Sequence, residues 1–353
     1  MSKGGSYMEI IATSVHLIDY ENETTKLIAP PEAFEEYVSE LISYINDNTT
    51  IREFVTESRR TEVVSGAISI MENIDDSDSV QRDFNIIANR LLRKETEAQQ
   101  RVEHMDIQLQ KGSLIQALVF TKENQKYTYL LAKVEHGGFV DDVDFSFKSG
   151  FSKDKKTIWK TCIFDLSDTE TSKIPAKIYS NTAAKYWWSD FLELSPVIND
   201  ENNTRNAFKA IDSTMNKMIK VASPYDHTLI RNTFVSWFRN RDHLDYDQMV
   251  RDVLDSFVPA ELPQEKVTAL RDRLLELPEE RKFDRQFTPV PTAIKARIKK
   301  VYDVYQGIKL HITEEIDDIE QVITAERSPD GTQYIKIKTT EKATFLDFYH
   351  KNK

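Results

Sequence analysis

Two apolar segments, 113-SLIQALVF-120 and 127-YTYLLAKVE-135, flank the turn-like residues 122-KENQK-126 and decide the fold class of the first half of the chain. Short apolar runs on either side of a polar turn predict a β-hairpin. Two further segments, 139-FVDDVDFSF-147 and 157-TIWKTCIFDL-166, alternate in side-chain character with the period of a strand. We therefore expect a sheet built from these strands.

The residues before this hairpin predict two more strands and two helices. The segment 9-EIIATSVHLIDYENETTKLI-28 is rich in β-branched residues on both sides of a turn at residues 21–24. Residues 30–47 begin with proline and repeat apolar residues along one helical face, and residues 79–102 show the same stripe. The first part of the chain is thus expected to be a mixed antiparallel sheet with helices.

Helical periodicity takes over after the polar linker 167-SDTETSKIP-175. We expect helices at residues 181–194, 201–221, 226–240, 246–256 and 263–276.

The last segment mixes both kinds of element. Proline at 291 and glycine at 307 bound a predicted helix whose buried stripe would be Ile294, Ile298, Val301 and Tyr305. The Asp-Gly turn in 327-RSPDG-331 predicts a hairpin. The sequence thus predicts an α+β protein with an N-terminal α+β domain (1–175), a helical domain (176–280) and a small C-terminal α/β module (281–353).

The adjacent tryptophans of 185-KYWWSDFLEL-194 allow two interpretations. They could form a platform on which bases or sugars stack, but stacking sites usually interleave aromatic residues with Lys and Arg. On a helix they fall on one apolar stripe, which predicts core packing and which we favour. The members of that stripe are Ala183, Ala184, Trp187, Trp188, Phe191, Leu192 and Leu194.

The composition of the chain limits the classes of function that it can have. The 353 residues carry a net charge of −11, but residues 281–353 hold fourteen Lys and Arg against eleven Asp and Glu, so the charge is uneven. The longest apolar run, 114-LIQALVF-120, is too short to span a bilayer. The single cysteine, Cys162, lies in a predicted strand and is expected to be an inert buried thiol of a cytoplasmic protein.

Motifs of catalysis are missing from the sequence. It contains no phosphate-binding P-loop, dinucleotide fingerprint, nucleophile elbow or HExxH motif, and its seven histidines never pair at metal-ligand spacing. The acidic runs 141-DDVD-144 and 314-EEIDDIE-320 more often mark solvated faces than metal sites. We expect no catalytic residues, metal ligands or cofactor; a metal-dependent nuclease using Asp141, Asp142 or Asp144 stays an alternative.

Three basic groups could meet phosphates, although solvated lysines are the commoner role for each group taken alone. The group 90-RLLRK-94 lies on a helix that also carries acidic residues. The other two groups supply the candidate nucleic-acid contacts, which are Lys153, Lys155, Lys156 and Lys160 in one group and Lys295, Arg297, Lys299 and Lys300 in the other.

The order of segments resembles the bacterial nucleoid-associated protein family of the NdpA (YejK) type. The resemblance is carried by 15-VHLI-18, 34-FEEYVSELISYI-45, 84-FNIIANRLLRKETE-97, 129-YLLAKVEHG-137, 160-KTCIFDLSD-168, 183-AAKYWWSDFLEL-194, 204-TRNAFKAIDSTMNK-217 and 283-FDRQFTP-289. It implies a cytosolic, nucleoid-located protein that binds DNA and has no established catalytic chemistry.

The leading hypothesis is therefore non-catalytic, sequence-tolerant binding to double-stranded DNA. A homodimer would double the phosphate contacts and raise avidity. A second hypothesis is a protein-interaction or sensor component, for example in phage defence, that meets its partner through the acidic surface.

Overall fold

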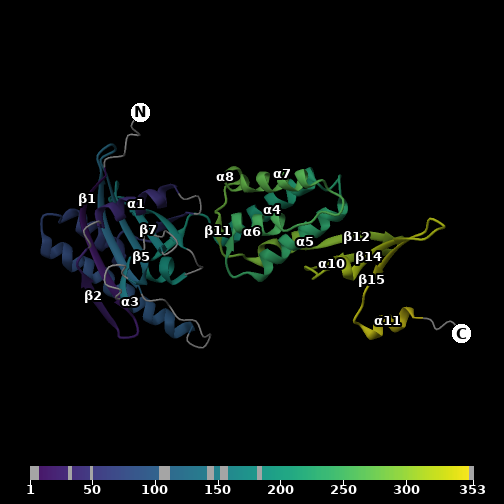
Figure 1. Ribbon diagram of the computed structural model, residues 1–353, viewed down its shortest axis with the longest axis horizontal. Coiled ribbons are helices and arrows are strands. Elements are labelled where there is room, and N and C mark those ends of the chain that lie inside the picture. The colour runs from purple at the N-terminus through teal and green to yellow at the C-terminus, as the bar shows by residue number, and fades with distance from the viewer. Residues whose placement is uncertain are drawn as a thin grey trace. The chain divides into compact units, whose positions relative to one another are not determined.

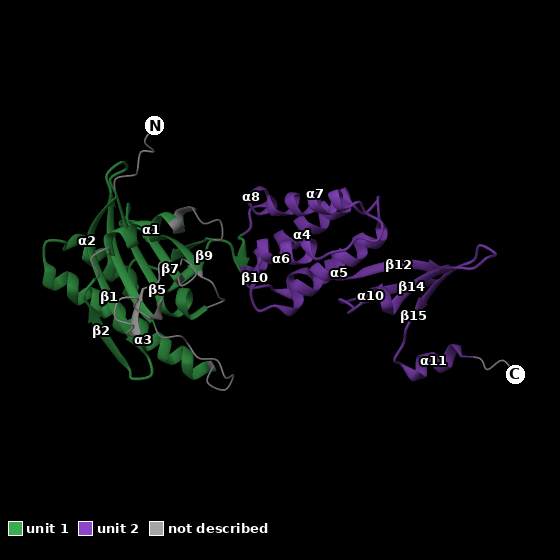
Figure 2. Ribbon diagram, viewed as in Figure 1, with its two compact units in different colours: residues 1–199, 284–286 green, residues 200–283, 287–353 purple. Residues whose placement is uncertain are grey.

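The computed structural model describes residues 8–30, 34–47, 51–102, 112–140, 147–151, 158–180 and 185–349 (Figure 1). The chain divides into two compact units (Figure 2). Unit 1 comprises residues 1–199 with 284–286, and unit 2 comprises residues 200–283 with 287–353. This division differs from the three predicted parts, because residues 176–199 belong with the N-terminal sheet and residues 287–353 group with the helices.

Unit 1 is built on one antiparallel sheet with helices, so the predicted α+β class is confirmed (Figure 1). The strand order is β2-β1-β4-β5-β7-β8-β3-β9, and β6 pairs with β5. The strands are β1 (Met8–Asp19), β2 (Thr24–Ile28), β3 (Arg52–Thr56), β4 (Gly112–Thr121), β5 (Lys126–Val140), β6 (Phe147–Phe151), β7 (Ile158–Asp165), β8 (Pro175–Ser180) and β9 (Leu194–Pro196).

The hairpin β4–β5 is buried on both faces, which explains its near-continuous apolar sequence. Alternate residues belong to different cores: Leu118 and Leu131 lie in one, and Ile115 and Ala132 in the other. The first core contains residues of α2 (Glu62–Glu72) and α3 (Ser77–Val102), and the second contains residues of α1 (Phe34–Asp47). The period-two pattern of the strands therefore assigns each side chain to one layer.

The paired tryptophans lie in a π-helix, η3 (Tyr186–Phe191), which β9 follows. Trp187 is fully buried and its ring lies 5.0 Å from that of Phe191, whereas Trp188 is partly buried at 5.4 Å from Phe54. The core interpretation of the aromatic stretch is confirmed. Residues 181–184 of the predicted helix lie outside the described residues, and Leu194 already belongs to a strand.

Unit 2 begins with the predicted helical region. Phe208, Phe234 and Phe238 lie at the centre of its core. Asp226 fixes the loop before α7, because its carboxylate accepts hydrogen bonds from the backbone N–H groups of residues 260–262 at 2.8–2.9 Å. The elements are α4 (Asp200–Met218), α5 (Pro224–Asn240), β10 (Leu244–Asp245), α6 (Tyr246–Asp255), α7 (Gln264–Leu275), α8 (Leu277–Arg281) and β11 (Gln286–Phe287).

The helix predicted over residues 291–307 is wrong beyond Ile298. The chain forms a 3₁₀ turn, η4 (Pro291–Ile294), one helical turn, α9 (Lys295–Ile298), and then a strand, β12 (Lys300–Tyr305). Val and Tyr residues favour a strand here, and Gly307 takes φ +82° in the turn that returns the chain. Tyr305, expected in a buried stripe, is 76 % exposed.

The remaining elements form two hairpins and two short helices. The predicted Asp-Gly hairpin is confirmed, since β14 (Ile323–Arg327) pairs antiparallel with β15 (Gln333–Ile337) and Gly331 takes φ +89° in the turn. The first hairpin pairs β12 with β13 (Ile308–Ile312). The helices are α10 (Ile319–Val322) and α11 (Lys342–Phe348).

Candidate nucleic-acid interface

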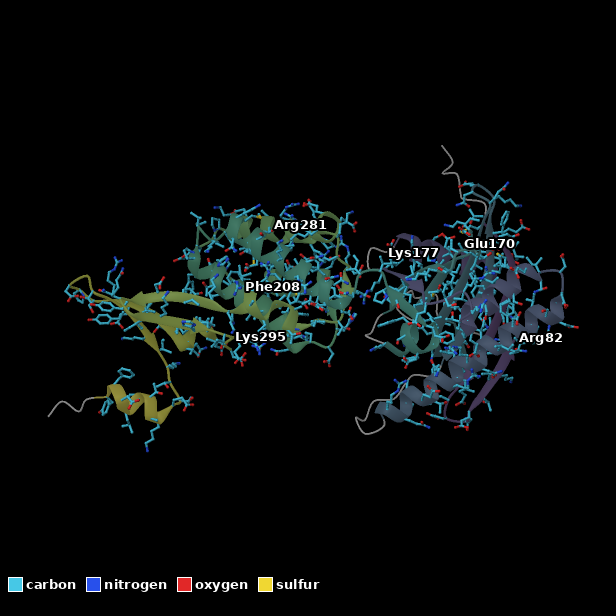
Figure 3. All side chains as sticks on the ribbon, turned by 180° about the vertical axis from the view of Figure 1, so that it is seen from behind. Arg82, Glu170, Lys177, Phe208, Arg281 and Lys295 are labelled. Carbon is cyan, nitrogen blue, oxygen red and sulfur yellow. The ribbon has the colours of Figure 1, made fainter. Side chains whose placement is uncertain are left out.

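The second predicted basic group lies at the surface of unit 2. Ile294 and Ile298 are buried in the core of the unit and anchor the short helix α9. The residues between and after these anchors, Lys295, Arg297 and Lys299, are exposed, and Figure 3 labels Lys295. The local sequence thus explains the arrangement, because isoleucines four residues apart fasten one side of a single turn while the cations stay in water.

Arg231 of α5 connects this turn to the helices. Its Nε donates a hydrogen bond to Asp212 of α4 at 2.7 Å, and its Nη2 donates to the backbone carbonyl of Arg297 at 2.6 Å. A partly buried guanidinium with two fixed acceptors holds its partners firmly. Arg231 therefore sets where the exposed cations of α9 lie on the helical bundle.

Lys300 joins the same group from the start of β12. Burial lowers the pKa of its ammonium, the charges of Arg231 and Lys220 lower it further, and Asp212 opposes them. Lys220 lies just after α4 and is exposed. We call Lys220, Arg231, Lys295, Arg297, Lys299 and Lys300 the basic cluster.

His227 reports the positive potential of the basic cluster. Its imidazole is buried, and burial lowers its pKa to about 4, with Lys300, Lys220 and Arg231 acting in the same direction against Asp212. The ring is therefore neutral at pH 7. Its Nε2 has no hydrogen-bond partner among the residues that the structure describes. Charge concentrated in this way favours an anion at the adjacent surface.

The first predicted basic group does not form such a surface within the described residues. Lys153, Lys155 and Lys156 lie outside them. Lys160 is described, and it is only 6 % exposed, with its ammonium 5.2 Å from the centre of the Tyr186 ring. The prediction that Lys160 contacts DNA is corrected here, because a side chain covered by the sheet and η3 cannot reach a phosphate.

Lys160 instead belongs to a buried charged group that the sequence analysis missed. It faces Lys133 across the β5–β7 ladder, and Lys133 forms a buried ion pair with Glu95 of α3. The Tyr186 hydroxyl donates to Glu95 Oε1 at 3.2 Å. Burial and then the charge of Lys133 lower the pKa of Lys160 to about 8, against the effect of Glu95. The available signal was Lys133 within the apolar run 129-YLLAKV-134.

The third basic group, 90-RLLRK-94, holds unit 1 together. Arg90 is buried, contacts Glu62 at 2.6 Å and Glu193 at 2.8 Å, and donates to the Phe191 carbonyl at 2.8 Å. Arg93 pairs with Glu62 as well, at 2.8 Å. These contacts link α3 to α2 and to η3, so this group stabilises the fold.

The acidic runs are only partly described. Asp141, Asp142 and Asp144 of the nuclease alternative lie outside the described residues. In the other run, Glu314 and Glu315 both pair with Arg239. Within the described ranges no three His, Cys, Asp or Glu side chains are grouped to hold a metal ion. Burial raises the pKa of the Cys162 thiol well above its usual range, as expected for an inert cysteine.

No protein-family model matches the chain, and no curated protein matches it. Among the described helices, none is long and apolar enough to cross a membrane.

Proposed function

We propose that this protein binds double-stranded DNA without catalysis and with little sequence preference, through the phosphates that face the basic cluster. One observation supports this most: the exposed residues Lys295, Arg297 and Lys299 lie on a turn held by Arg231, beside Lys220 and Lys300. We further propose that it lies in the bacterial nucleoid, as the resemblance to the NdpA-type family implies, and that it acts as a homodimer, which would double its phosphate contacts.

The physical basis is local concentration of positive charge on an acidic chain. Residues 1–280 carry a net charge of −14, which follows from the net charge of −11 and the +3 of residues 281–353. A polyanion is repelled by most of such a surface and attracted where cations gather. Each phosphate that the cluster neutralises releases condensed counterions, and this release drives association. The acidic remainder then orients the DNA toward the cluster.

The geometry favours contacts to phosphates over contacts to base edges. The cluster residues extend from the end of α4, from α5, from the four-residue helix α9 and from the start of β12. Sequence readers usually insert a longer helix or a β-ribbon into the major groove. Lysines on separate elements neutralise the backbone but carry no sequence information.

The test is equilibrium binding of the full chain to labelled duplexes of unrelated sequence, at several salt concentrations, with and without magnesium. We expect equal affinities for the different duplexes and a linear fall of log K against log salt. The slope should be about −0.9 for each phosphate contact. An absence of binding at low salt would refute the proposal, and magnesium-dependent cleavage would favour the nuclease alternative.

A further inference from the structure

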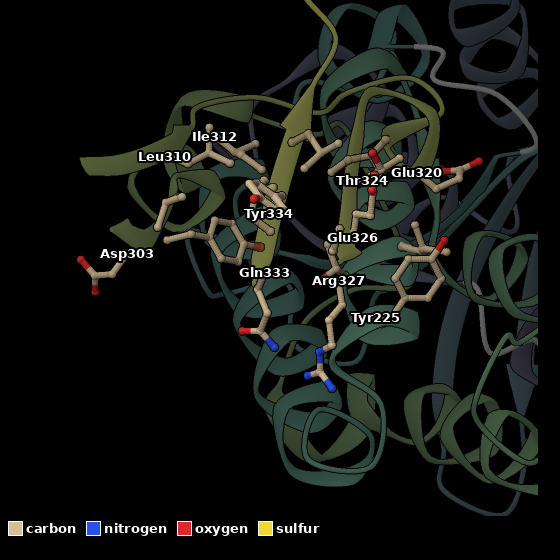
Figure 4. Close-up of a pocket in the computed structure, with 18 residues that line it drawn as sticks. Tyr225, Asp303, Leu310, Ile312, Glu320, Thr324, Glu326, Arg327, Gln333 and Tyr334 are labelled. Carbon is tan, nitrogen blue, oxygen red and sulfur yellow. The ribbon is translucent and has the colours of Figure 1, made fainter. Parts of the chain in front are cut away.

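Unit 2 contains a large groove between its two C-terminal hairpins and α5 (Figure 4). Its volume is about 880 Å³. Apolar and aromatic side chains form much of its wall, among them Tyr302, Leu310, Ile312, Ile323, Tyr334 and Ile335. Each hairpin is a two-stranded sheet, and such hairpins are only marginally stable in water without further packing. The groove is therefore a surface that gains stability when it is covered.

The same chain carries an apolar element that its own fold leaves uncovered. Every residue of α11 is exposed in the described part of the chain. Its large side chains are 48 % (Phe345), 56 % (Leu346) and 86 % (Phe348) exposed, and the adjoining Tyr349 is 51 % exposed. The rings of Phe345 and Tyr349 stack at 4.9 Å, so these aromatics lie side by side. A helix this short is not stable by itself in water and needs a surface to pack on.

We propose that α11 of a second copy of this chain docks in the groove, and that the two copies exchange this helix reciprocally. A groove and an uncovered helix on one chain form a self-complementary pair, as a two-fold dimer interface requires. The helix-in-groove arrangement is a common way to bury an amphipathic segment. Because the same two copies exchange helices with each other, the association closes at two subunits.

Charge does not oppose this docking. The groove lining carries three carboxylates, Asp303, Glu320 and Glu326, and one guanidinium, Arg327, while Lys309 and Lys336 pair with Asp303 and Glu326. In residues 338–349, Lys338 and Lys342 balance Glu341 and Asp347. Burial of apolar area therefore drives the contact.

The buried area is sufficient for a stable dimer. A large aromatic side chain buries on the order of 200 Å² when it is fully covered, so the exposed parts of Phe345, Phe348 and Tyr349 amount to about 370 Å². With the groove surface that they cover and both exchanged helices, the total reaches about 1,200 Å². Specific protein interfaces bury about 1,200–2,000 Å².

This inference rests on the homodimer part of the proposed function and is independent of the DNA-binding part. A monomer that binds duplex DNA with a steep salt dependence would overturn the homodimer and the exchange but leave the DNA-binding part standing. A helix-exchanged dimer without affinity for DNA would overturn only the basic cluster. The two failures are therefore distinguishable.

The first experiment measures the mass of the full chain by sedimentation at several concentrations. We expect a dimer, and we expect Phe345→Ser/Phe348→Ser to raise the dimer dissociation constant by about 100-fold or more, as for truncated aromatic anchors. The control is Val221→Ser/Val258→Ser, which removes two exposed apolar side chains of unit 2 outside the groove and helix. Circular dichroism checks that each variant is folded.

A mixing experiment separates exchange from other arrangements. Ile335→Glu places a charge on the groove wall, at a position that is 46 % exposed in the single chain. Each defective variant alone should be monomeric, whereas their mixture should form a heterodimer, because one intact helix then meets one intact groove. Dimers that persist in both variants would overturn the proposal. A monomeric wild type would also overturn it, in favour of docking within one chain.

Discussion

The lysines of unit 1 and the cations of unit 2 resemble each other in sequence but lie in opposite environments. Lys133 and Lys160 project from adjacent strands into a layer closed by α3 and η3, where Glu95 supplies the counter-charge. Lys295, Arg297 and Lys299 project from one turn whose isoleucines are buried instead. The difference shows that spacing of basic residues predicts a phosphate contact only when the element's buried side is also known.

The two regions also differ in how their charges are balanced. In unit 1 a buried carboxylate compensates the buried ammonium groups, and such pairs cost about as much desolvation as they return in attraction. In unit 2 Arg231 is paired with Asp212, while burial and the charges of Arg231 and Lys220 lower the pKa of Lys300. We therefore expect an anion to bind more favourably beside the basic cluster of unit 2 than beside the buried lysines of unit 1.

The largest expected effect comes from removing the counter-charge of unit 1. Glu95→Leu leaves the buried Lys133 ammonium without its carboxylate, and we expect a loss of about 3–5 kcal/mol in the free energy of unfolding. The measurement is denaturant unfolding followed by tryptophan fluorescence in a Trp237→Phe background. In that background the remaining tryptophans, 159, 187 and 188, all report on unit 1.

The matched control for Glu95→Leu is the double variant Glu95→Leu/Lys133→Met. It replaces both charges with apolar groups of similar length, and it should recover most of the lost stability. Equal destabilisation in the single and double variants would contradict the account of Lys133 as a group that depends on Glu95.

An intermediate effect is expected at His227 when the pH falls. The pKa of this group is lowered from 6.5 to about 4 in the folded chain, so the unfolded state binds its proton first. Stability from this group is complete above pH 6.5 and is lost as the pH falls toward 4, by at most about 3 kcal/mol. Carboxylates also titrate in this range, so the quantity to compare is the difference between wild type and His227→Leu. If the free energy of unfolding changed with pH in the same way in wild type and in His227→Leu, the loss of stability could not be assigned to His227.

The smallest expected effect on DNA binding is that of Lys160. Because its ammonium is buried, Lys160→Met should change duplex affinity by less than about twofold. The same variant should also lack the rise in the free energy of unfolding that the wild type shows at alkaline pH. The folded pKa of about 8 lies below the unfolded value of 10.5, so the wild type gains stability as the pH rises between them. A wild type whose free energy of unfolding did not change between pH 8 and 10.5 would contradict the lowered pKa of Lys160.

The sequence predicted those elements whose conformation is determined by residues close together in the chain. The hairpin 113–135 and the Asp-Gly hairpin were predicted because turn and strand signals adjoin in sequence. The pairing of β3 with β8 and β9 was not, since it joins residues far apart in the chain. The helix predicted at 291–307 failed because apolar residues at helical spacing also suit a strand and its turn.

The sequence predicted only the part of the candidate site that is contiguous in the chain. The cations of residues 295–300 could be found from composition, because the segment is basic in sequence. Arg231, Lys220 and His227 could not, since only the packing of α5 against α4 and α9 brings them to that surface. The burial of Lys160 likewise depends on α3 and η3, which no spacing within β7 reveals.

The central claim is that phosphates contact the basic cluster of unit 2, and one paired measurement tests it most directly. The salt dependence of duplex binding is compared between Lys295→Glu/Arg297→Glu/Lys299→Glu and Lys26→Glu/Lys173→Glu/Lys177→Glu. Both variants acquire the same net charge, and the second set lies exposed on unit 1 (Figure 3 labels Lys177). We predict that the first variant reduces the magnitude of the log–log slope by about 2 to 3 and that the second leaves it nearly unchanged. Equal reductions in both variants would contradict a local interface.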